Sequence, residues 1–559
     1  MISSGRGHLE YPEKTLYELL AQTAGDCPEA CAMDLYGKKI RFGELLREIG
    51  RAAQALSACG IGPGDTVTLC MPNLPQTMIL FYAASRVGAT ACMLHPQSAV
   101  KEIVFSLRLT GSRLVLTLDQ FYETVLTAVQ EYAEPVTLVV ARAADGLPPV
   151  AAAAALLSNR RYGAFPYAGR GILWKEFLRQ GAASSPLPPA PFSAGHTAVI
   201  LSSGGTGGSP KAVALSDLAF NACALQARHA IGTEFGPGLS MLSCMPCFHG
   251  FGLGMNLHAA LIHGVTCLLM PAFHIRDYAK MLLQKHPNYI AGVPTIFDAL
   301  LHLPGMEKAD LGFLRGVFCG GDTLPASLKE TVDGFLRSHG ASVEIREGYG
   351  LTECVTASCL TPLSGWHRGS IGLPFPDTDY AIVRPGTEKL LPCGETGEII
   401  LTGPSLMQGY LGDPAETEKA LRRLPDGRLW LYTGDLGCLD EDGFVYFRGR
   451  IKRMIITNGF NVYPSQIEAV LQSCPGVREA AVIGVPDPRR MQKVRAYVVP
   501  AEGCAPDAAS RAAIQEHLQT WIARYALPRE IVFLPALPRT DVGKVDIRAL
   551  EQYDESLPV

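Results

Sequence analysis

The sequence predicts an α/β protein in which a large N-terminal domain of layered α/β subdomains precedes a smaller α+β C-terminal domain. Three observations support this prediction. The chain has 559 residues, which is too long for one hydrophobic core. Helical and strand patterns alternate over residues 15–140 and again over 197–360. A basic segment that contains Gly449, at 448–453, then precedes a shorter α+β pattern.

Helices and strands alternate in the first part of the chain. Apolar residues recur at helical spacing over 15–24, 42–59 and 76–87, and the last of these helices is expected to end at Gly88. The apolar run 67–71, flanked by turn residues, predicts a short buried strand. This order is typical of a largely parallel sheet covered by helices.

Two stretches interrupt the alternation. Residues 141–190 contain an alanine run followed by Arg-, Gly- and Pro-rich sequence, and we expect peripheral, poorly ordered structure there. After residue 360, strands and turns dominate, and the segments GETGEIILTGP and DEDGFVYFRGR are both typical of β-hairpins.

We place the domain boundary at the basic segment, which gives an N-terminal domain of residues 1–449 and a C-terminal domain of residues 450–559. Within the second domain, the pattern predicts helices over 465–473 and 508–525 and strands over 480–485, 494–499 and 531–534.

Composition and charge argue against several classes of function. Hydrophobic residues make up 48% of the chain and charged residues 18%, which is typical of a packed globular protein. The net charge of −4 gives no electrostatic reason to expect nucleic acid or an anionic membrane as the main partner. The N-terminus lacks an apolar signal segment, and no later apolar run approaches the ~18 residues of a membrane span. We therefore expect a cytoplasmic protein with no integral membrane segment.

The 16 cysteines are dispersed, mostly inside apolar runs, which favours buried free thiols in a reducing compartment over a disulfide framework. Cys244 and Cys247 form a C-x-x-C pair with His249 close behind, a pattern that also suggests zinc. Because the sequence has no second C-x-x-C pair, a structural role is favoured over a metal site.

The segment LSSGGTGGSPKAV at 201–213 is the most informative in the chain. It exposes backbone N–H groups and hydroxyls to an anion while Lys211 supplies a positive charge, and proteins hold polyphosphates in this way. It is not a Walker loop, because Gly208 is followed by Ser-Pro-Lys. Alternation resumes after Lys211, so we expect the loop to join two strands rather than to open a helix. Taken alone, such a loop is also typical of a plain flexible connection.

Other polar clusters follow apolar runs, where open α/β sheets bind ligands. The segment REGYGLTE at 346–353 comes after a strand expected at 342–345. Its glycines permit close approach of the backbone, Tyr349 offers a flat face for a purine, and Glu353 offers a hard oxygen for Mg²⁺. A tight turn with a surface carboxylate is the alternative.

Two further features are more ambiguous. Asp435, expected just after a strand in the segment YTGD, suits the hydroxyls of a ribose or else forms an Asx-turn. The segments FRGRIK at 447–452 and TNGFN at 457–461, and the isolated Lys544, are otherwise typical of solvated surface.

Together and in this order, these segments resemble the adenylate-forming superfamily of acyl-CoA synthetases, peptide-synthetase adenylation domains and luciferases. The resemblance extends from Thr15 to Leu550 and includes MPCFHGFG at 245–252, GVPT at 292–295, GGD at 320–322 and GSIGLP at 369–374. It implies a small β-barrel-like subdomain within the large domain and a mobile C-terminal domain. The implied reaction couples a carboxylic acid to ATP with Mg²⁺, releases pyrophosphate, and passes the acyl group to the thiol of CoA or of a carrier protein.

The resemblance also implies a role for each matching residue. Lys544 would bridge the carboxylate and the α-phosphate, and Glu353 would hold Mg²⁺. With Lys544, the implied catalytic residues are Thr352, Glu353 and His249. The implied ATP-binding residues are Ser203, Gly205, Thr206, Gly208, Lys211, Gly320, Gly321, Asp322, Glu347, Gly348, Tyr349, Gly350, Thr352, Asp435, Arg450 and Lys544.

The remaining implied roles concern the acid and the thiol. Lys452 matches the hinge of the small domain, and Gly459, Phe460 and Asn461 match the loop that opens the thiol path. His249 stands where amino-acid-activating relatives usually have an aspartate, and this uncharged wall suits an apolar acyl or aryl chain. A packed core histidine is the alternative. The implied acyl pocket consists of His249, Phe251, Gly252, Val293, Gly320 and Gly350.

The chain departs from the commoner family pattern at four positions. Gly204, Gly207 and Ala212 replace a serine, a threonine and a glycine of the phosphate loop, which removes hydroxyls from it. Glu347 stands where the family often has Gln or Asn near the adenine amino group, and its carboxylate can still accept that hydrogen bond.

Three functional hypotheses follow. The first is a ligase that joins a medium- or long-chain fatty acid to CoA, and the second is a standalone ligase that loads a carrier protein. The sequence shows no insertion between Lys452 and Gln466 of the kind found in carrier-specific relatives, which favours CoA. The third is a nucleotide-binding protein that has lost catalysis, against which the presence of Lys544, Glu353 and Asp435 argues.

Overall fold

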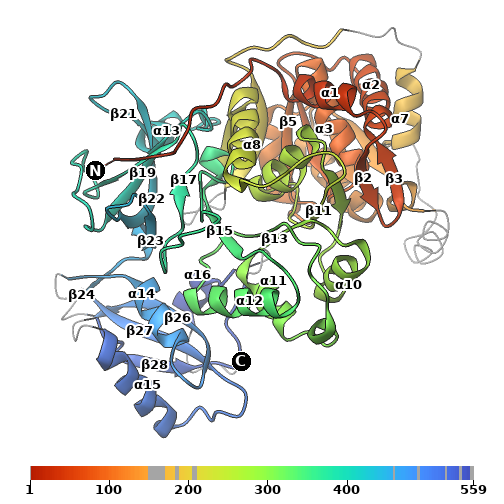
Figure 1. Ribbon diagram of the computed structural model, residues 1–559. Coiled ribbons are helices and arrows are strands. Elements are labelled where there is room, and N and C mark those ends of the chain that lie inside the picture. The colour runs from red at the N-terminus through yellow and green to blue at the C-terminus, as the bar shows by residue number, and fades with distance from the viewer. Residues whose placement is uncertain are drawn as a thin grey trace.

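The computed structural model describes residues 2–148, 170–182, 188–203, 211–457, 460–487, 491–522, 526–540 and 544–553 (Figure 1). In these residues, the chain forms three sheets in the N-terminal part and one in the C-terminal part. The C-terminal sheet (blue) lies at the lower left in Figure 1. The mixed α/β class and the division into a large and a small unit are as predicted.

The first sheet has eight strands in the order β20-β10-β9-β5-β4-β6-β7-β8. The five strand pairs from β9 to β8 in this order are parallel, and the β9–β10 and β10–β20 pairs are antiparallel. The strands are β4 (Thr66–Cys70), β5 (Thr90–Leu94), β6 (Leu114–Leu118), β7 (Thr137–Ala141), β8 (Ile172–Leu173), β9 (Thr197–Ser203), β10 (Lys211–Ser216) and β20 (Gly409–Tyr410).

The second sheet has nine strands in the order β17-β16-β15-β14-β13-β11-β12-β2-β3, parallel from β15 to β2. The strands are β2 (Cys31–Leu35), β3 (Lys38–Arg41), β11 (Ser240–Ser243), β12 (Thr266–Leu269), β13 (Tyr289–Gly292), β14 (Gly316–Cys319), β15 (Ile345–Tyr349), β16 (Cys359–Leu360) and β17 (Leu373–Pro374).

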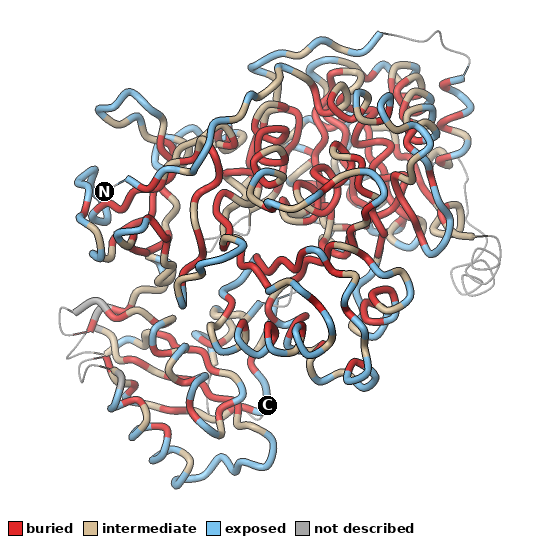
Figure 2. Tube along the Cα trace, in the orientation of Figure 1, coloured by how far each residue is buried: buried red, intermediate tan, exposed pale blue. Residues whose placement is uncertain are grey.

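Helix α3 (Pro75–Val87) is the most buried helix of the first sheet's layer. Every residue from 75 to 85 is buried, and most of these residues are apolar. Proline at its first turn and Gly88 in the left-handed region at its end set its limits, as the sequence predicts. Figure 2 shows the buried residues concentrated in this part of the chain, and one hydrophobic cluster contains residues of all three N-terminal sheets.

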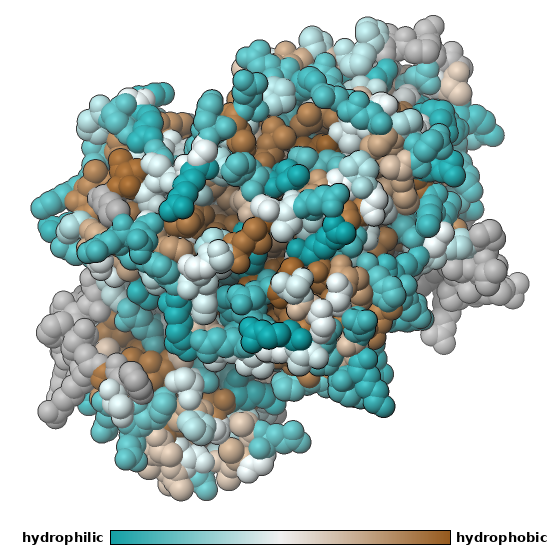
Figure 3. All heavy atoms as spheres, viewed as in Figure 1, coloured by the Kyte–Doolittle hydropathy of each residue, from teal (hydrophilic) through white to brown (hydrophobic). Residues whose placement is uncertain are grey.

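The other helices flank the sheets. They are α1 (Leu16–Asp26), α2 (Phe42–Ala58), α4 (Val100–Thr110), α5 (Tyr122–Tyr132), α7 (Trp174–Gly181), α8 (Asp217–Ile231), α9 (Ala260–Ile262), α10 (Ile275–Lys285), α11 (Pro294–Leu301), α12 (Ala326–Ser338) and α13 (Pro414–Ala420). A π-helix spans Phe251–Ala259. The face drawn in Figure 3 is mostly hydrophilic, and hydrophobic residues show in patches between the polar ones.

The third sheet is the part expected to be barrel-like. It is antiparallel and has six strands, in the order β1-β18-β19-β22-β21, with β23 also paired to β22. The strands are β1 (Ile2–Ser4), β18 (Asp379–Val383), β19 (Gly397–Thr402), β21 (Leu421–Arg423), β22 (Leu429–Leu439) and β23 (Val445–Arg450). Both segments expected in hairpins supply strands here, β19 and β23.

The C-terminal unit has a separate hydrophobic core. Its five-stranded sheet has the order β25-β24-β27-β26, and β28 pairs with β27. The strands are β24 (Ile455–Thr457), β25 (Phe460–Val462), β26 (Val477–Asp487), β27 (Met491–Pro500) and β28 (Glu530–Phe533), and the helices are α14 (Pro464–Gln472), α15 (Ala508–Trp521) and α16 (Ile547–Glu551). The helices and strands that the sequence predicts after residue 464 are therefore present, with α15 shorter than expected.

The expectation for 141–190 is wrong for residues 170–182. This segment forms β8 and α7, and Trp174 and Phe177 are buried. A Cβ atom at Gly181 would lie 2.4 Å from the backbone nitrogen of Ala55, so α7 packs closely on α2. The apolar residues of α7 recur at helical spacing, but the helix is short and lies between Gly- and Pro-rich stretches. Residues 149–169 and 183–187 lie outside the described part of the chain.

Two local expectations are also wrong. The strand expected at 342–345 is β15, which begins at Ile345 and runs through the polar motif to Tyr349. Pairing with β14 and β16 holds these polar residues in a ladder. Asp435 does not follow a strand but lies inside the long β22, opposite Arg450 on β23.

Among the described residues, no helix has the length and apolar character needed to cross a membrane.

Candidate functional site

The phosphate loop joins two antiparallel strands, as predicted. Ser203 ends β9 and lies opposite Lys211, which begins β10. The hairpin therefore brings a hydroxyl and an ammonium group to one sheet edge. The predicted phosphate ligands Gly205, Thr206 and Gly208 lie outside the described residues.

Lys211 is held by two side chains that sequence reasoning did not identify. Its Nζ lies 2.6 Å from a carboxylate oxygen of Glu416 and 4.4 Å from the ring centroid of Tyr410. Tyr410 also donates a hydrogen bond of 2.9 Å to Glu353. One aromatic residue thus connects the phosphate-loop lysine with the predicted metal ligand. Neither contact has a local sequence signal, because the partners are far apart in the chain.

Thr352 and Glu353 lie in a single turn of 3₁₀-helix (Thr352–Cys354) directly after β15, and both are half-buried. The carbonyl of Glu353 accepts a hydrogen bond from the backbone of Met407, at 2.8 Å. This bond and the one from Tyr410 fix the motif against the segment that carries β20. Carboxylate oxygens suit Mg²⁺, so Glu353 fits the predicted metal ligand.

Close backbone packing explains three glycines of the predicted site. A Cβ atom at Gly350 would lie 1.7 Å from the carbonyl oxygen of Thr356, and one at Gly252 would lie 2.0 Å from that of Pro246. At Gly320, a Cβ atom would come within 3.1 Å of the Gly348 carbonyl oxygen. Side chains at these positions would force neighbouring strands and turns apart.

One wall of the predicted acyl pocket is assembled in space. The ring of Phe251 lies 3.6 Å from a Cβ position at Gly320, and Val293 lies 3.5 Å from one at Gly321. Gly320, Gly321 and Asp322 follow β14 directly, and Val293 follows β13. The ends of two neighbouring parallel strands therefore meet here, which is where such sheets bind ligands.

His249 precedes Phe251 by two residues and is half-buried. Its Nε2 is buried and has no hydrogen-bond partner among the described residues, and its ring centroid is 4.9 Å from that of Phe248. Burial, followed by the nearby charges of His95 and Lys544, lowers the pKa of His249 to about 4. The imidazole is therefore neutral at physiological pH, and it interacts electrostatically with Lys544 of the C-terminal unit.

A hydrogen bond and an ion pair connect Tyr349, Asp435 and Arg450. The Tyr349 hydroxyl donates a hydrogen bond of 2.8 Å to Asp435 Oδ2, and Arg450 Nε lies 3.4 Å from Oδ1. Asp435 is only 2% exposed, and its Oδ1 has no hydrogen-bond partner within the described part of the chain. A buried carboxylate oxygen without a donor is costly, so this atom fits a hydroxyl of a bound ligand.

Glu347 is buried on β15 and accepts a hydrogen bond of 3.0 Å from the backbone of Leu324. Burial is the main reason that the pKa of Glu347 is raised to about 8, and the charge of Asp322 adds to the shift. The carboxyl group is therefore largely protonated at neutral pH and can donate as well as accept a hydrogen bond. This behaviour brings it closer to the amide side chains usual at this position.

Lys544 comes to the same site from the C-terminal unit, just before α16. Although the residue is exposed, loss of hydration around its ammonium lowers the pKa of Lys544. The charges of Asp322 and Asp435 oppose this shift, and that of Arg450 adds to it. The ammonium group therefore interacts electrostatically with residues of β22, β23 and the Gly320–Asp322 turn.

The remaining predicted positions lie in the segment that joins the two units. Lys452 is exposed in a 3₁₀ turn (Ile451–Arg453) directly after β23. Phe460 and Asn461 belong to β25, and Gly459 lies outside the described residues. The zinc alternative gains no support, because the buried thiols of Cys244 and Cys247 contact the backbone carbonyls of Ala291 and Met71.

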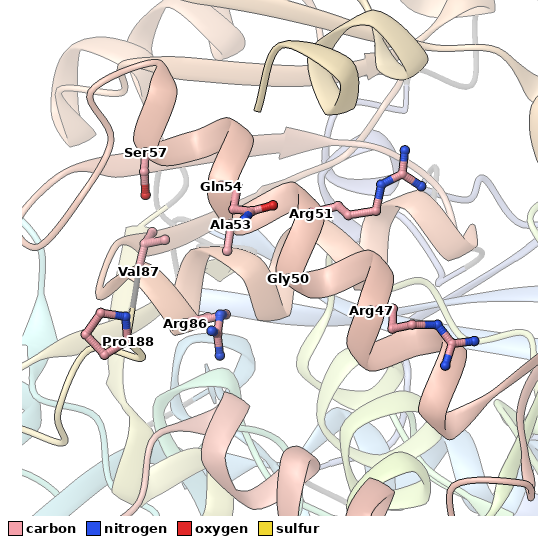
Figure 4. A pocket seen from close by; sticks show the side chains of 9 residues that line it. All are labelled: Arg47, Gly50, Arg51, Ala53, Gln54, Ser57, Arg86, Val87 and Pro188. Carbon is pink, nitrogen blue, oxygen red and sulfur yellow. The ribbon is translucent and has the colours of Figure 1, made fainter. Parts of the chain in front are cut away.

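A cavity of about 330 Å³ lies apart from these residues, between α2 and the end of α3 (Figure 4). Arg47 and Arg51 extend away from Val87 and Pro188 in this view. Arg51 is paired with Glu48, and Arg86 lies over the ring of Tyr17. The cavity contains none of the residues that the sequence predicts in the site.

Comparison with known proteins identifies the family. The family described as AMP-binding enzyme matches residues 20–411, and its C-terminal domain matches residues 466–544. The chain belongs to the AMP-binding enzyme family. The resemblance to the adenylate-forming superfamily that the motifs suggest is therefore confirmed, as is the α/β fold.

Members of the AMP-binding family resemble this chain over nearly its whole length. A long-chain-fatty-acid–CoA ligase of Bacillus subtilis (strain 168) is 30% identical over 552 residues, which cover 98% of this chain and 96% of the relative. A feruloyl-CoA synthase of an Amycolatopsis species is 31% identical over 522 residues, which cover 93% of this chain and 94% of that relative. The crystal structure of ATP-bound MatB from Rhodopseudomonas palustris has a TM-score of 0.82 and 26% identity, covering 96% of this chain and 98% of MatB.

Proposed function

We propose that this protein activates a carboxylic acid with ATP to an acyl-adenylate and then transfers the acyl group to the thiol of CoA. The observation that carries the proposal is that the ammonium of Lys544, which belongs to the C-terminal unit, interacts electrostatically with Asp322, Asp435 and Arg450. Asp435 can accept a hydrogen bond from a ribose, and the apolar wall can hold the acid. A cation between them can neutralise the negative charge that develops where the substrate carboxylate attacks the α-phosphate. The named CoA ligases among the relatives support the same reaction.

In the first half-reaction the substrate carboxylate attacks the α-phosphorus of ATP, and pyrophosphate leaves. We assign Lys211 and Ser203 to the β- and γ-phosphates, together with Thr206. Thr352 contacts the α-phosphate and Lys544 stabilises the charge shared by the attacking carboxylate and the α-phosphate. Glu353 would hold Mg²⁺, which neutralises phosphate charge when bound.

The adenosine part of ATP is assigned to residues of β14, β15 and β22. Tyr349 stacks on the adenine, and the Gly320–Asp322 turn covers its other face. Glu347 forms hydrogen bonds with the exocyclic amine and the adjacent ring nitrogen of the adenine. Oδ1 of Asp435, which has no hydrogen bond within the described part of the chain, accepts one from a ribose hydroxyl, while Arg450 donates to the sugar.

The second half-reaction requires a different geometry at the same place. We propose that the part of the C-terminal domain that follows Lys452 rotates about this residue after the adenylate forms, which withdraws Lys544 and admits the thiol beside Gly459, Phe460 and Asn461. Alternation of this kind lets one site perform two reactions with incompatible requirements.

The acid is proposed to be a medium- or long-chain fatty acid. Phe251, Val293 and the neutral His249 form an apolar wall without a fixed charge to bind a second polar group on the acid. The fatty-acid ligase relative supports this assignment, whereas the feruloyl-CoA synthase relative directs attention to aromatic acids.

ATP–pyrophosphate exchange tests the proposal. The purified protein is offered fatty acids of increasing length, ferulate and a dicarboxylic acid in parallel assays. We expect exchange to be strongest with a straight-chain fatty acid. Strongest exchange with ferulate would overturn the choice of acid, and absence of exchange with every acid would indicate a protein that binds nucleotide without adenylating.

The acceptor is tested separately with the best acid. We expect acyl transfer to CoA at a higher kcat/KM than to a carrier protein that bears a pantetheine arm. The reverse order would assign the enzyme to carrier loading.

A further inference from the structure

The ammonium of Lys211 already has an anionic partner within the chain. Glu416 Oε2 lies 2.6 Å from Lys211 Nζ, and both side chains are about one-third exposed. The other oxygen of Glu416 lies 2.6 Å from Lys419 Nζ. These two lysines hold the carboxylate charged, and their hydrogen bonds lower the pKa of Glu416 to about 2.

The position of Glu416 is fixed by local structure. Asp413 caps α13, and its side chain accepts a hydrogen bond of 3.0 Å from the backbone nitrogen of Glu416. Thr417, the next residue, accepts a hydrogen bond of 2.9 Å from the backbone of Tyr410. The turn between β20 and α13 therefore carries Tyr410 and Glu416 together to the same lysine.

This arrangement places a carboxylate where a phosphate is expected. Lys211 begins β10 at the mouth of the predicted phosphate loop, and through Tyr410 it is linked to Glu353. A polyphosphate bound by Lys211 brings several negative charges close to Glu416. It must either displace the carboxylate from the ammonium or accept repulsion from it.

We propose that Glu416 is a positioning residue that competes with the β- and γ-phosphates for Lys211 and so weakens binding of the pyrophosphate end of the nucleotide. The proposal rests on the proposed function, because it assigns Lys211 to those phosphates. It implies that Glu416 favours release of pyrophosphate after adenylation, since the carboxylate returns to the lysine as the product leaves. AMP, which has only the α-phosphate, is bound without this competition.

Isothermal titration of the full-length Glu416→Gln variant tests the proposal with three ligands. We expect the Kd values for Mg-ATP and for Mg-pyrophosphate to fall by about fivefold, as for the loss of one partly screened charge interaction. The Kd for AMP is expected to stay within about twofold of the wild-type value. Unchanged or higher Kd values for ATP and pyrophosphate would overturn the proposal, as would an equal change for AMP.

Glu418→Gln is the matched control. Glu418 lies on the same helix two residues away and is exposed, and the substitution removes the same charge. We expect it to leave all three Kd values unchanged. If Glu418→Gln strengthens ATP binding as much as Glu416→Gln does, the effect comes from the overall negative charge of the helix. That result would refute competition for Lys211.

A Lys211→Met background separates competition from simple repulsion. Without the ammonium, Glu416→Gln is expected to give less than half of its gain in affinity for pyrophosphate. The same gain in both backgrounds would contradict the competition. Failure of the proposed function has a different signature, because the wild-type protein would then show no acid-dependent ATP–pyrophosphate exchange, whether or not it binds nucleotide.

Discussion

The two units of the molecule contribute to the site in opposite ways. The N-terminal unit presents its polar groups from strands and tight turns, and Asp435 is 2% exposed on β22 with Tyr349 bonded to it. The C-terminal unit contributes Lys544 from an exposed position just before Val545, which pairs with Arg539 in an isolated β-bridge. In the proposed function, nucleotide recognition is therefore assigned to one folded core, whereas the reacting charge is supplied from the other unit. Such an arrangement allows the charge to be withdrawn without dismantling the nucleotide site.

Lys544→Ala is expected to have the largest effect on this comparison. Loss of the ammonium removes a charge-assisted contact formed in the transition state, so ATP–pyrophosphate exchange should fall by about 10²–10³-fold. The Kd for AMP should hardly change, because the adenosine contacts belong to the other unit. An equally large loss of AMP binding would show that Lys544 serves recognition rather than reaction.

Glu347→Gln tests whether burial raises the pKa of Glu347 in the folded protein. The folded-state pKa of about 8 lies above the ordinary value of 4.5, so the folded protein binds more protons than the unfolded one between these values. The contribution of Glu347 to stability is therefore lost as pH rises through this window. At pH 7, the variant should be more stable by up to about 3 kcal/mol.

Thermal unfolding at several pH values measures this effect. The melting temperatures of wild type and variant should be close at pH 5 and should separate progressively up to pH 8. A constant difference across this range would mean that Glu347 ionises normally.

Asp435→Asn addresses recognition directly. The substitution removes the charge that accepts hydrogen bonds from Tyr349 and from the proposed ribose hydroxyl, which should cost about 2 kcal/mol, or roughly 30-fold in Kd. We expect ATP and AMP to be weakened equally, as measured by titration. Weakening of ATP alone would move Asp435 from the ribose to the phosphates.

Phe251→Ala should have the smallest effect among these variants. Removing the ring beside Gly320 enlarges the proposed acyl wall, so the preference among fatty acids should shift towards bulkier acids by about tenfold in kcat/KM. The KM for ATP should remain close to that of the wild type. A change in ATP affinity without a change in acid preference would place Phe251 outside the acyl pocket.

Sequence reasoning succeeded where local patterns determine the structure. The limits of α3 follow from Pro75 and Gly88, and the resumed alternation after Lys211 identifies the β9–β10 hairpin. It failed where pairing overrides local pattern. The polar residues of β15 resemble a turn in the sequence, yet strands on both sides extend the ladder to Tyr349.

The contacts of the site were less predictable than its elements. The Lys211–Glu416 pair joins residues that are 205 positions apart, and no periodicity or motif in the sequence links them. Similarly, GDPAETEK at 412–419 has the pattern of an ordinary capped helix, and only the fold shows which face meets the phosphate loop. Family motifs identified the polar groups, but their partners depend on the tertiary arrangement.

The central claim is that Lys544 acts in adenylation from a unit that does not build the nucleotide site. The most direct test measures both half-reactions on the Lys544→Ala enzyme in single turnovers, using synthetic acyl-adenylate for the transfer step. We predict that adenylate formation slows by at least about 10²-fold, while transfer from the supplied adenylate to CoA keeps its wild-type rate. Equal slowing of both steps, or full-speed adenylate formation, would contradict the account.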